Sequence, residues 1–400
     1  MKRTWCIILL CCLCFLNGCG DVDLKGSPQK EADKEITVTK KTAEEIKDEF
    51  LEKKLSRMSL EEKTGQLFMC AFRKDEAGHN ITKINKTMED TMKQYHIGNV
   101  ILFGENIDTE EQTKNLILDL QANSTIPLLV GVDEEGGRVS RLHASGKIPV
   151  PVIPTAEELA ATGGPVSVFE AGKTIGKELK ELGFQIDFAP VADVNTNPDN
   201  VVIGDRAFGS DGETVAKMVS AFLKGLREEG ISGCVKHFPG HGDTAMDSHK
   251  NETYVIHDRE RLKRVEFVPF QQAIDEKVDL VMMAHIKTPN VTTDGFPASL
   301  SYEMVTQILR KELGFQGIVI TDAMDMGAIS DYYEPDEAVV MALEAGVDII
   351  LMPENCESAV SAVLDAVHTG ILPEERITES AKRVLSLKYD KGLFAEDKTK

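Results

Sequence analysis

Eight short apolar segments, spaced along most of the chain, constrain its fold more than any other feature. Between them lie amphipathic stretches with helical periodicity, such as 166–181, 212–229 and 259–276. Strands rich in Val, Ile and Leu that alternate with helices are typical of a parallel sheet covered on both faces. Eight such units in roughly 340 residues predict a single (β/α)8 barrel of the TIM type. The segments are 66–71, 99–103, 127–132, 186–191, 233–235, 280–284, 317–321 and 347–352. An open doubly wound sheet is the alternative, but no Gly-x-Gly-x-x-Gly follows the first segment.

The first 19 residues are predicted to be a signal peptide rather than part of the fold. A positively charged start precedes an apolar run over 5–16, which is too short to span a membrane comfortably. The run ends in Leu-Asn-Gly-Cys at 16–19, which resembles the bacterial lipoprotein signal, in which the cysteine is lipidated. Cys19 is therefore the predicted lipidation site. An ordinary signal peptide cut near Gly18 or Gly20 is the alternative.

The rest of the chain is predicted to divide into a tether, one barrel and a short tail. Residues 20–48 are charged and poor in large apolar residues, so we expect a flexible tether with a helix starting near Thr42. No other linker-like stretch precedes the predicted C-terminal tail at 394–400. The barrel is therefore expected over 49–393.

The charge of the chain argues against some classes of partner. The formal net charge of −21 argues against nucleic acid as a partner, and membrane contact is expected through the lipid anchor only.

Five of the eight cysteines lie in the signal segment. The other three, Cys70, Cys234 and Cys356, have no CxxC spacing. Each is predicted to be a small core residue rather than a disulfide partner or zinc ligand.

The segment with the most titratable groups follows the fifth apolar segment. Residues 236–249 read KHFPGHGDTAMDSH, which places a lysine, three histidines and two aspartates around a Pro-Gly-x-Gly turn. Glycine and proline disfavour both helix and strand, so this run is predicted to be a loop. Loops that leave strand ends commonly carry catalytic residues, and we expect catalysis here.

Charged residues also follow most of the other predicted strands. In a (β/α)8 barrel the carboxyl ends of the strands meet at one face, where the active site lies. A charge beside a buried strand is costly unless it is paired or functional, so the sequence predicts one site at this face. These residues are 133–141 after the third segment, 193–195 and 205–209 after the fourth, His285 after the sixth, and Asp322 and Asp325 after the seventh.

The motifs resemble those of glycoside hydrolase family 3, and more narrowly its bacterial β-N-acetylhexosaminidase branch. The resemblance rests on KHFPGHGDTAMDSH, on DEEGGRVSR at 133–141, on ITDAMDM at 320–326 and on MSLEEKTGQLF at 58–68. It runs in order from about residue 50 to residue 393. It implies a barrel without the second sandwich domain of the β-glucosidase members.

The resemblance implies roles for individual residues. Asp322 matches the nucleophile, and His249 with Asp247 matches an acid/base dyad on the loop after the fifth strand. Another set matches the residues that bind the hydroxyls and acetamido group of the terminal sugar. These are Asp133, Arg141, Arg206, Lys236 and His237.

The residue types suit hydrolysis of a glycosidic bond with retention of configuration. The reaction needs a carboxylate to attack the anomeric carbon and an acid to protonate the leaving oxygen. Asp322 can attack if cations such as Lys236 or Arg206 keep it ionised. A histidine can be the acid because its ordinary pKa is about 6.5, and Asp247 would orient the ring of His249.

Several residues have alternative interpretations. The histidines could hold zinc, but Pro239 and Gly240 remove the helical spacing of HExxH, so no metal is expected. Asp325 is a rival nucleophile, although its place beyond the strand end favours capping of the next helix. Asp133 and Glu134 could form the acidic pair of enzymes in which the substrate's own acetamido group attacks.

Three charged residues are predicted to support the site without belonging to it. His285 and Asp193 are expected to bond neighbouring loops. Arg138 is expected to support its own loop rather than contact sugar.

The sequence therefore predicts a lipid-anchored, extracytoplasmic exo-β-N-acetylglucosaminidase that is a monomer and needs no metal or cofactor. Its expected substrates are cell-wall fragments or related glycans with terminal non-reducing β-N-acetylglucosamine, cleaved through a covalent intermediate on Asp322. Phosphorolysis is an alternative, because a histidine acid/base does not repel phosphate. A non-catalytic peptidoglycan- or sugar-binding lipoprotein is another, although the loss of Asp322 or His249 that would mark it is not seen.

Overall fold

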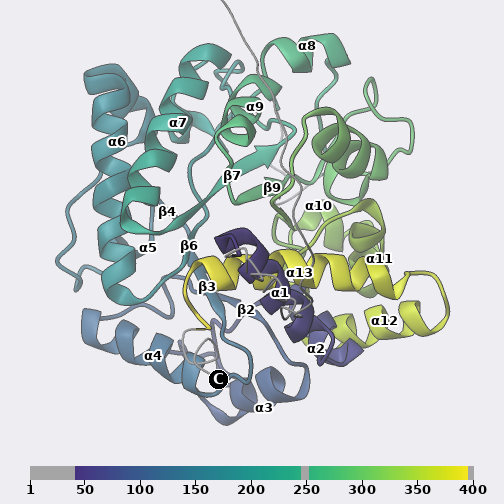
Figure 1. Ribbon diagram of the computed structural model, residues 1–400. Coiled ribbons are helices and arrows are strands. Elements are labelled where there is room, and N and C mark those ends of the chain that lie inside the picture. The colour runs from purple at the N-terminus through teal and green to yellow at the C-terminus, as the bar shows by residue number, and fades with distance from the viewer. Residues whose placement is uncertain (1–40, 245–251, 395–400) are drawn as a thin grey trace, which may run out of the picture. The chain divides into compact units, whose positions relative to one another are not determined.

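The computed structural model describes residues 41–244 and 252–394 (Figure 1). The predicted signal peptide with Cys19, most of the predicted tether, the predicted dyad Asp247 and His249, and the tail after 394 lie outside the described residues.

Eight parallel strands form the centre of the fold. In chain order they are β1 (Phe68–Ala71), β2 (Asn99–Ile101), β3 (Leu129–Val132), β6 (Ile186–Asp187), β7 (Ser232–Phe238), β9 (Leu280–Met283), β11 (Ile318–Thr321) and β12 (Ile350–Leu351). They pair in the order β11-β9-β7-β6-β3-β2-β1-β12. A bridge between Ile320 and Ile349 joins the two edge strands, so the sheet nearly closes into a barrel. All eight predicted segments contain a strand, and the predicted (β/α)8 fold is confirmed.

The strands read as continuous apolar runs because both of their faces are buried. Met69 and Ile101 belong to a cluster inside the barrel, whereas their neighbours Phe68, Cys70 and Val100 pack in the layer between strands and helices. Side chains alternate between the two faces of a strand, so a strand with two apolar environments shows no polar alternation.

Helices follow the strands and cover the outside of the barrel. They are α3 (Lys86–Gln94), α4 (Glu110–Ala122), α6 (Ala156–Leu182), α7 (Gly212–Glu229), α8 (Arg259–Arg264), α9 (Phe267–Asp275), η3 (Glu303–Glu312), α10 (Gly327–Ser330), α11 (Pro335–Ala345), α12 (Cys356–His368) and α13 (Glu374–Asp390). Sequence signals fix their starts: Thr155 and Glu158 form a capping box on α6, and Asp211 caps α7. Neighbouring α6 and α7 (Figure 1) approach closely at Gly172 and Gly225, where a Cβ would clash with the facing backbone.

Short elements lie in the loops. Near the carboxyl ends of the strands these are β4 (Glu134–Gly136), β5 (Val139–Ser140), α5 (Arg141–Ala144) and η1 (Gly204–Arg206), followed along the chain by β8 (Thr253–Tyr254), β10 (Ile286–Lys287) and η2 (Ala298–Leu300).

Two helices precede the barrel, α1 (Ala43–Leu55) and α2 (Leu60–Gly65). On α1, Leu51 and Leu55 are buried, and the ring of Phe50 lies 5.1 Å from that of Tyr389 on α13. The helix starts at Ala43, near the predicted Thr42 and within the stretch assigned to the tether. No helix among the described residues is long and apolar enough to cross a bilayer.

The cysteines correct one sequence prediction. Cys70 at the end of β1 and Cys356 at the start of α12 form a disulfide across 286 residues of sequence. The prediction that both are merely small core residues is therefore wrong. Barrel closure pairs β1 with β12, which brings the two cysteines together although nothing in their spacing indicates it. Cys234 is a free, buried cysteine inside the barrel, as predicted.

Candidate active site

A cavity of about 500 Å³ opens at the carboxyl ends of the strands. Six of the eight residues predicted for catalysis and sugar binding line it, and the other two, Asp247 and His249, lie outside the described residues. The six are Asp133, Arg141, Arg206, Lys236, His237 and Asp322.

The loop after β3 directs Asp133 and Glu134 to different environments. Asp133 faces the cavity, whereas the Glu134 carboxylate accepts hydrogen bonds from the N–H groups of Arg141 and Leu142 at 2.8 and 3.0 Å. Glu134 also accepts a hydrogen bond from the Ser140 hydroxyl. It therefore holds the start of α5, and with it the backbone of Arg141. The alternative acidic pair of Asp133 and Glu134 is wrong.

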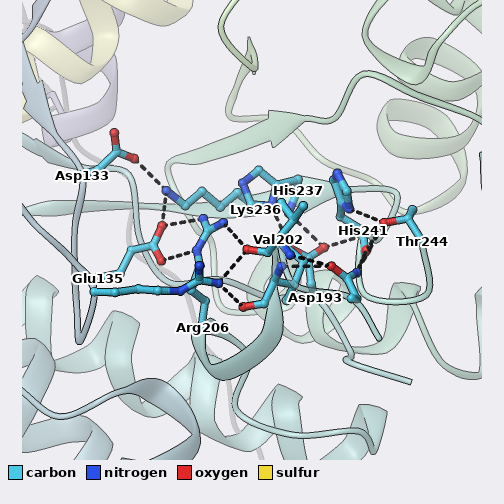
Figure 2. A network of polar contacts seen from close by, with 12 residues as sticks. Asp133, Glu135, Asp193, Val202, Arg206, Lys236, His237, His241 and Thr244 are labelled. Atoms are coloured by element: carbon cyan, nitrogen blue, oxygen red, sulfur yellow. Dashed lines mark hydrogen bonds and ion pairs between the residues drawn. The ribbon is translucent and has the colours of Figure 1, made fainter. Parts of the chain in front are cut away.

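Glu135, for which the sequence predicted no role, joins Arg206 and Lys236 in the polar network that Figure 2 shows. Its carboxylate accepts two hydrogen bonds from the Arg206 guanidinium, both 2.8 Å long. The Lys236 ammonium lies 2.7 Å from Glu135 and donates a 2.7 Å hydrogen bond to Asp133. The only sequence sign of Glu135 was its place within the 133–141 motif. The family resemblance implied roles for its neighbours Asp133 and Arg141 and none for Glu135.

The network keeps Glu135, Arg206 and Lys236 charged. Burial alone would raise the pKa of Glu135, but Arg206 and Lys236 together hold it well below its usual range. Burial would likewise lower the pKa values of both cations. Glu135 raises the pKa of Arg206, and Asp133 with Glu135 raises that of Lys236. The side chain of Lys236 is only 3% exposed, so it is not a solvated surface lysine.

Arg141 completes the rim of the cavity beside Asp133. Its guanidinium lies 3.6 Å from the Asp133 carboxylate and 5.6 Å from the centre of the Phe103 ring. Arg138, in contrast, bonds Asp205 at 2.9 Å and the carbonyls of 201–203, so it links its own loop to the loop after β6.

Asp193 anchors the end of β7 and the loop that follows it. The prediction that 236–249 is a loop is wrong for 236–238, which belong to β7. One oxygen of the buried Asp193 carboxylate lies 2.7 Å from His237 Nδ1, and the other accepts hydrogen bonds from the N–H groups of His237 and His241. Burial would raise the pKa of Asp193, but His237 lowers it. Asp193 bonds the neighbouring loop as predicted, and it thereby orients a residue of the site.

His241 is a buried histidine of the loop that follows β7. Its Nδ1 lies 2.7 Å from the Thr244 hydroxyl, and its carbonyl accepts a hydrogen bond from Asn200. Burial lowers the pKa of His241 to about 4. The ring is therefore neutral at pH 7, and the base of the loop is fixed up to Thr244.

Asp322 lies half-buried at the end of β11. Its N–H donates to the carbonyl of Met283 on β9, and its carboxylate accepts a hydrogen bond from the Ala323 N–H, both at 2.8 Å. The two cations predicted to keep it ionised, Lys236 and Arg206, make their described ion pairs with Asp133 and Glu135. These ion pairs depend on Glu135, for which the sequence predicted no role.

Two neighbours of Asp322 have distinct roles. His285 bonds the Ser299 hydroxyl at 2.8 Å and the Ala323 carbonyl at 3.0 Å, so it links loops as predicted. Asp325 is exposed and lines the cavity. It is not the cap of α10, because Met326 holds that position and no side chain caps the helix. That prediction is wrong.

The polar cavity lies at the face where (β/α)8 barrels carry their active sites, and it contains a carboxylate after the seventh strand, a group that a retaining glycoside hydrolase needs. The family model described as "Glycosyl hydrolase family 3 N terminal domain" matches residues 59–387, and the chain belongs to this family.

Similar proteins of known name support membership of this family. Beta-hexosaminidase A of Pseudoalteromonas piscicida is 35% identical over 77% of this chain and 56% of its own length, so the chain spans little more than half of that relative. Beta-hexosaminidase LpqI of Mycobacterium tuberculosis is 39% identical over 74% of this chain and 76% of its own length. The structure of a glycoside hydrolase family 3 beta-N-acetylglucosaminidase from Paenibacillus sp. str. FPU-7 matches with a TM-score of 0.80 and 39% identity, over 84% of this chain and 63% of that one.

Proposed function

We propose that this protein is a retaining exo-β-N-acetylglucosaminidase that hydrolyses terminal non-reducing β-N-acetylglucosamine from cell-wall fragments or related glycans. The observation that carries the proposal is the single cavity that holds Asp322 together with Asp133, Arg141, Arg206, Lys236 and His237. The relatives named beta-hexosaminidase support the choice of sugar.

In the first step, an Asp322 oxygen attacks the anomeric carbon while the bond to the leaving oxygen breaks. His249 donates the proton that the leaving oxygen needs. In the second step, water loses a proton to His249 and attacks the same carbon, which releases the sugar and frees Asp322. Asp247 stabilises the imidazolium that is present before the first step and is formed again in the second. The roles of His249 and Asp247 rest on the family motif, since both lie outside the described residues.

The paired charges around Glu135 suit sugar binding. A carboxylate and an ammonium held 2.7 Å apart present fixed acceptors and donors to hydroxyl groups. They require little reorganisation when the sugar arrives, because Glu135, itself held by Arg206, already holds Lys236 in place.

We also propose that the protein is a monomer, anchored outside the cytoplasm through lipid on Cys19. The disulfide between Cys70 and Cys356 supports that location, because such bonds persist mainly in oxidising compartments. Changing Cys19→Ala should move the protein from the membrane fraction to the soluble fraction, as measured by fractionation and immunoblotting. Retention of the variant at the membrane would contradict the lipid anchor.

The enzymatic proposal is tested with the full chain in detergent and with its Asp322→Asn variant. The wild type should cleave aryl β-N-acetylglucosaminide, should cleave aryl β-glucoside poorly, and should be insensitive to EDTA. Asp322→Asn should lower kcat by about 10³-fold or more. Asp325→Asn is the matched control and should lose about tenfold or less.

A mechanism-based 2-fluoro sugar should label the wild type at Asp322, as mass spectrometry of peptides would show. A label on Asp325, or full activity of Asp322→Asn, would disprove the assignment of the nucleophile. No cleavage by folded protein would favour the sugar-binding lipoprotein. Product analysis with added phosphate separates hydrolysis, which releases free sugar, from phosphorolysis, which releases sugar 1-phosphate.

A further inference from the structure

A second cavity adjoins the candidate active site. It has a volume of about 540 Å³ and lies between the ends of β1 and β12 and the starts of α3 and α12. Arg73, Asp325 and Met352 line both cavities, so the two are contiguous. We call this second space the rim cavity. No residue that lines it alone has a role in the function proposed above.

The position of the rim cavity relative to Asp322 indicates what it holds. Around the barrel, β3 and β11 lie on opposite sides, four strands apart. A sugar bound by Asp133 after β3 and attacked by Asp322 after β11 must lie across the barrel mouth, with its anomeric carbon on the β11 side. The leaving group is joined to that carbon. It therefore extends away from β3 past the β11 side of the mouth, where the rim cavity begins at Asp325 and Met352.

The charge of the rim cavity indicates which leaving groups it accepts. Among the residues that the structure describes, its lining carries three carboxylates, those of Asp325, Glu354 and Glu357. The one guanidinium among these described lining residues, that of Arg73, is paired with Glu105 and lies 4.8 Å from the centre of the Phe103 ring. An excess of negative charge beside a binding site attracts cations and repels anions.

The walls of the rim cavity are held in place. The disulfide of Cys356, which lines the cavity, joins the start of α12 to β1. Met352 adopts a left-handed backbone conformation with φ 50°, while its N–H donates to the Met69 carbonyl at 2.9 Å. A residue other than glycine seldom adopts this conformation, and residues that do are concentrated at ligand sites. A rigid wall loses little entropy when a ligand binds.

We propose that the rim cavity is the leaving-group subsite and that it selects leaving groups with protonated amines, such as glucosamine units that lack the acetyl group. This inference rests on the proposed function and adds the leaving-group class to it. Carboxylate-bearing leaving groups are disfavoured by the same charges.

The test compares initial rates of N-acetylglucosamine release by the full chain at about pH 6, where most amines are protonated. One trisaccharide carries two glucosamine units behind the terminal N-acetylglucosamine, and the matched one is fully acetylated. Aryl β-N-acetylglucosaminide, whose leaving group is small, is the reference. The wild type should prefer the amine-bearing trisaccharide by about fivefold or more in kcat/KM, and added salt should reduce the preference.

The variants are Glu354→Gln and Glu354→Lys, with Glu375→Lys on α13 as the control of equal charge change. Glu354→Gln should reduce the preference and Glu354→Lys should abolish it, while all three retain wild-type activity on the aryl substrate. A wild type that prefers the acetylated trisaccharide, or a preference unchanged in Glu354→Lys, would overturn the inference. Equal loss in the Glu375→Lys control would also overturn it. If the proposed function itself is wrong, the aryl substrate is not cleaved by any of these proteins, which is a different result.

Discussion

The two ends of the barrel each contain a buried cluster of charges, and the clusters resemble each other in composition. At the carboxyl end, Glu135 is bound by Arg206 and Lys236, and its side chain is 6% exposed. At the amino end of β12, Asp348 lies among Arg310, Arg376 and Arg383, and its side chain is 0% exposed. In both, burial would raise the pKa of the carboxyl group, and the neighbouring cations keep it below its usual range.

The clusters differ in what surrounds them. Glu135 borders the cavity that contains Asp322. Asp348 instead accepts hydrogen bonds from Ser380 on α13 at 2.6 Å and from the Val319 N–H on β11 at 2.9 Å. It therefore fastens helices to the barrel. A buried charge cluster or a shifted pKa marks a candidate active site only where the cluster also borders space for a ligand.

The largest expected effect is a loss of stability when the Asp348 cluster is disrupted. Asp348→Asn leaves three buried or half-buried guanidinium groups without their carboxylate, so the free energy of unfolding should fall by about 3–5 kcal/mol. Urea denaturation measures this change. Glu379→Gln, which removes an exposed partner of Arg383, is the control and should cost less than about 1 kcal/mol. The folded Asp348→Asn protein should retain wild-type kcat on the aryl substrate. A large loss of kcat would show that the Asp348 cluster also affects catalysis.

The second largest expected effect is a loss of activity when the Glu135 cluster is disrupted. Glu135→Gln keeps the size of the side chain but releases Lys236 and Arg206 from their shared carboxylate. We expect kcat/KM on aryl β-N-acetylglucosaminide to fall about 10²-fold, equivalent to about 2.7 kcal/mol. Steady-state kinetics well below the midpoint of thermal unfolding measure it.

Glu105→Gln, which removes the partner of Arg73 at the rim of the same cavity, is the matched control and should change kcat/KM much less. Equal effects of the two variants would show that Glu135 has no special place in the site.

The smallest expected effect concerns pH and the base of the β7 loop. His241 has a pKa of about 4 when folded and about 6.5 when unfolded, so the unfolded state binds more protons between these values. Its contribution to stability is present above pH 6.5 and is lost as the pH falls toward 4. At pH 5 this group should make the protein about 2 kcal/mol less stable than at pH 7.

Denaturation of wild type and His241→Asn at both pH values isolates this effect, because asparagine can still bond Thr244 and does not titrate. The variant should show the smaller pH dependence. The exposed His143→Asn is the control and should resemble the wild type. An unchanged slope in His241→Asn would mean that the buried ring is not the group responsible.

The comparison of the clusters also shows where sequence analysis succeeded at the site. Asp133 and Asp322 were found because each directly follows a strand, and Lys236 because it lies near the carboxyl end of β7. Strand ends of a barrel converge whatever the rest of the chain does. Glu135 was missed because its importance comes from Arg206, a residue 71 positions away that only the folded loops bring to it. Asp325 was assigned to a helix cap because its spacing suits one, but the local backbone places Met326 there.

The sequence alone determined the order of strands and helices, the barrel and the residues at its carboxyl face. These follow from apolar runs and strand-end motifs, which are local patterns. Tertiary structure alone decided the disulfide between Cys70 and Cys356, the shared carboxylate of Glu135 and the rim cavity beside Asp322. Each depends on distances between segments far apart in the chain, and those distances are set by barrel closure and loop packing rather than by local sequence.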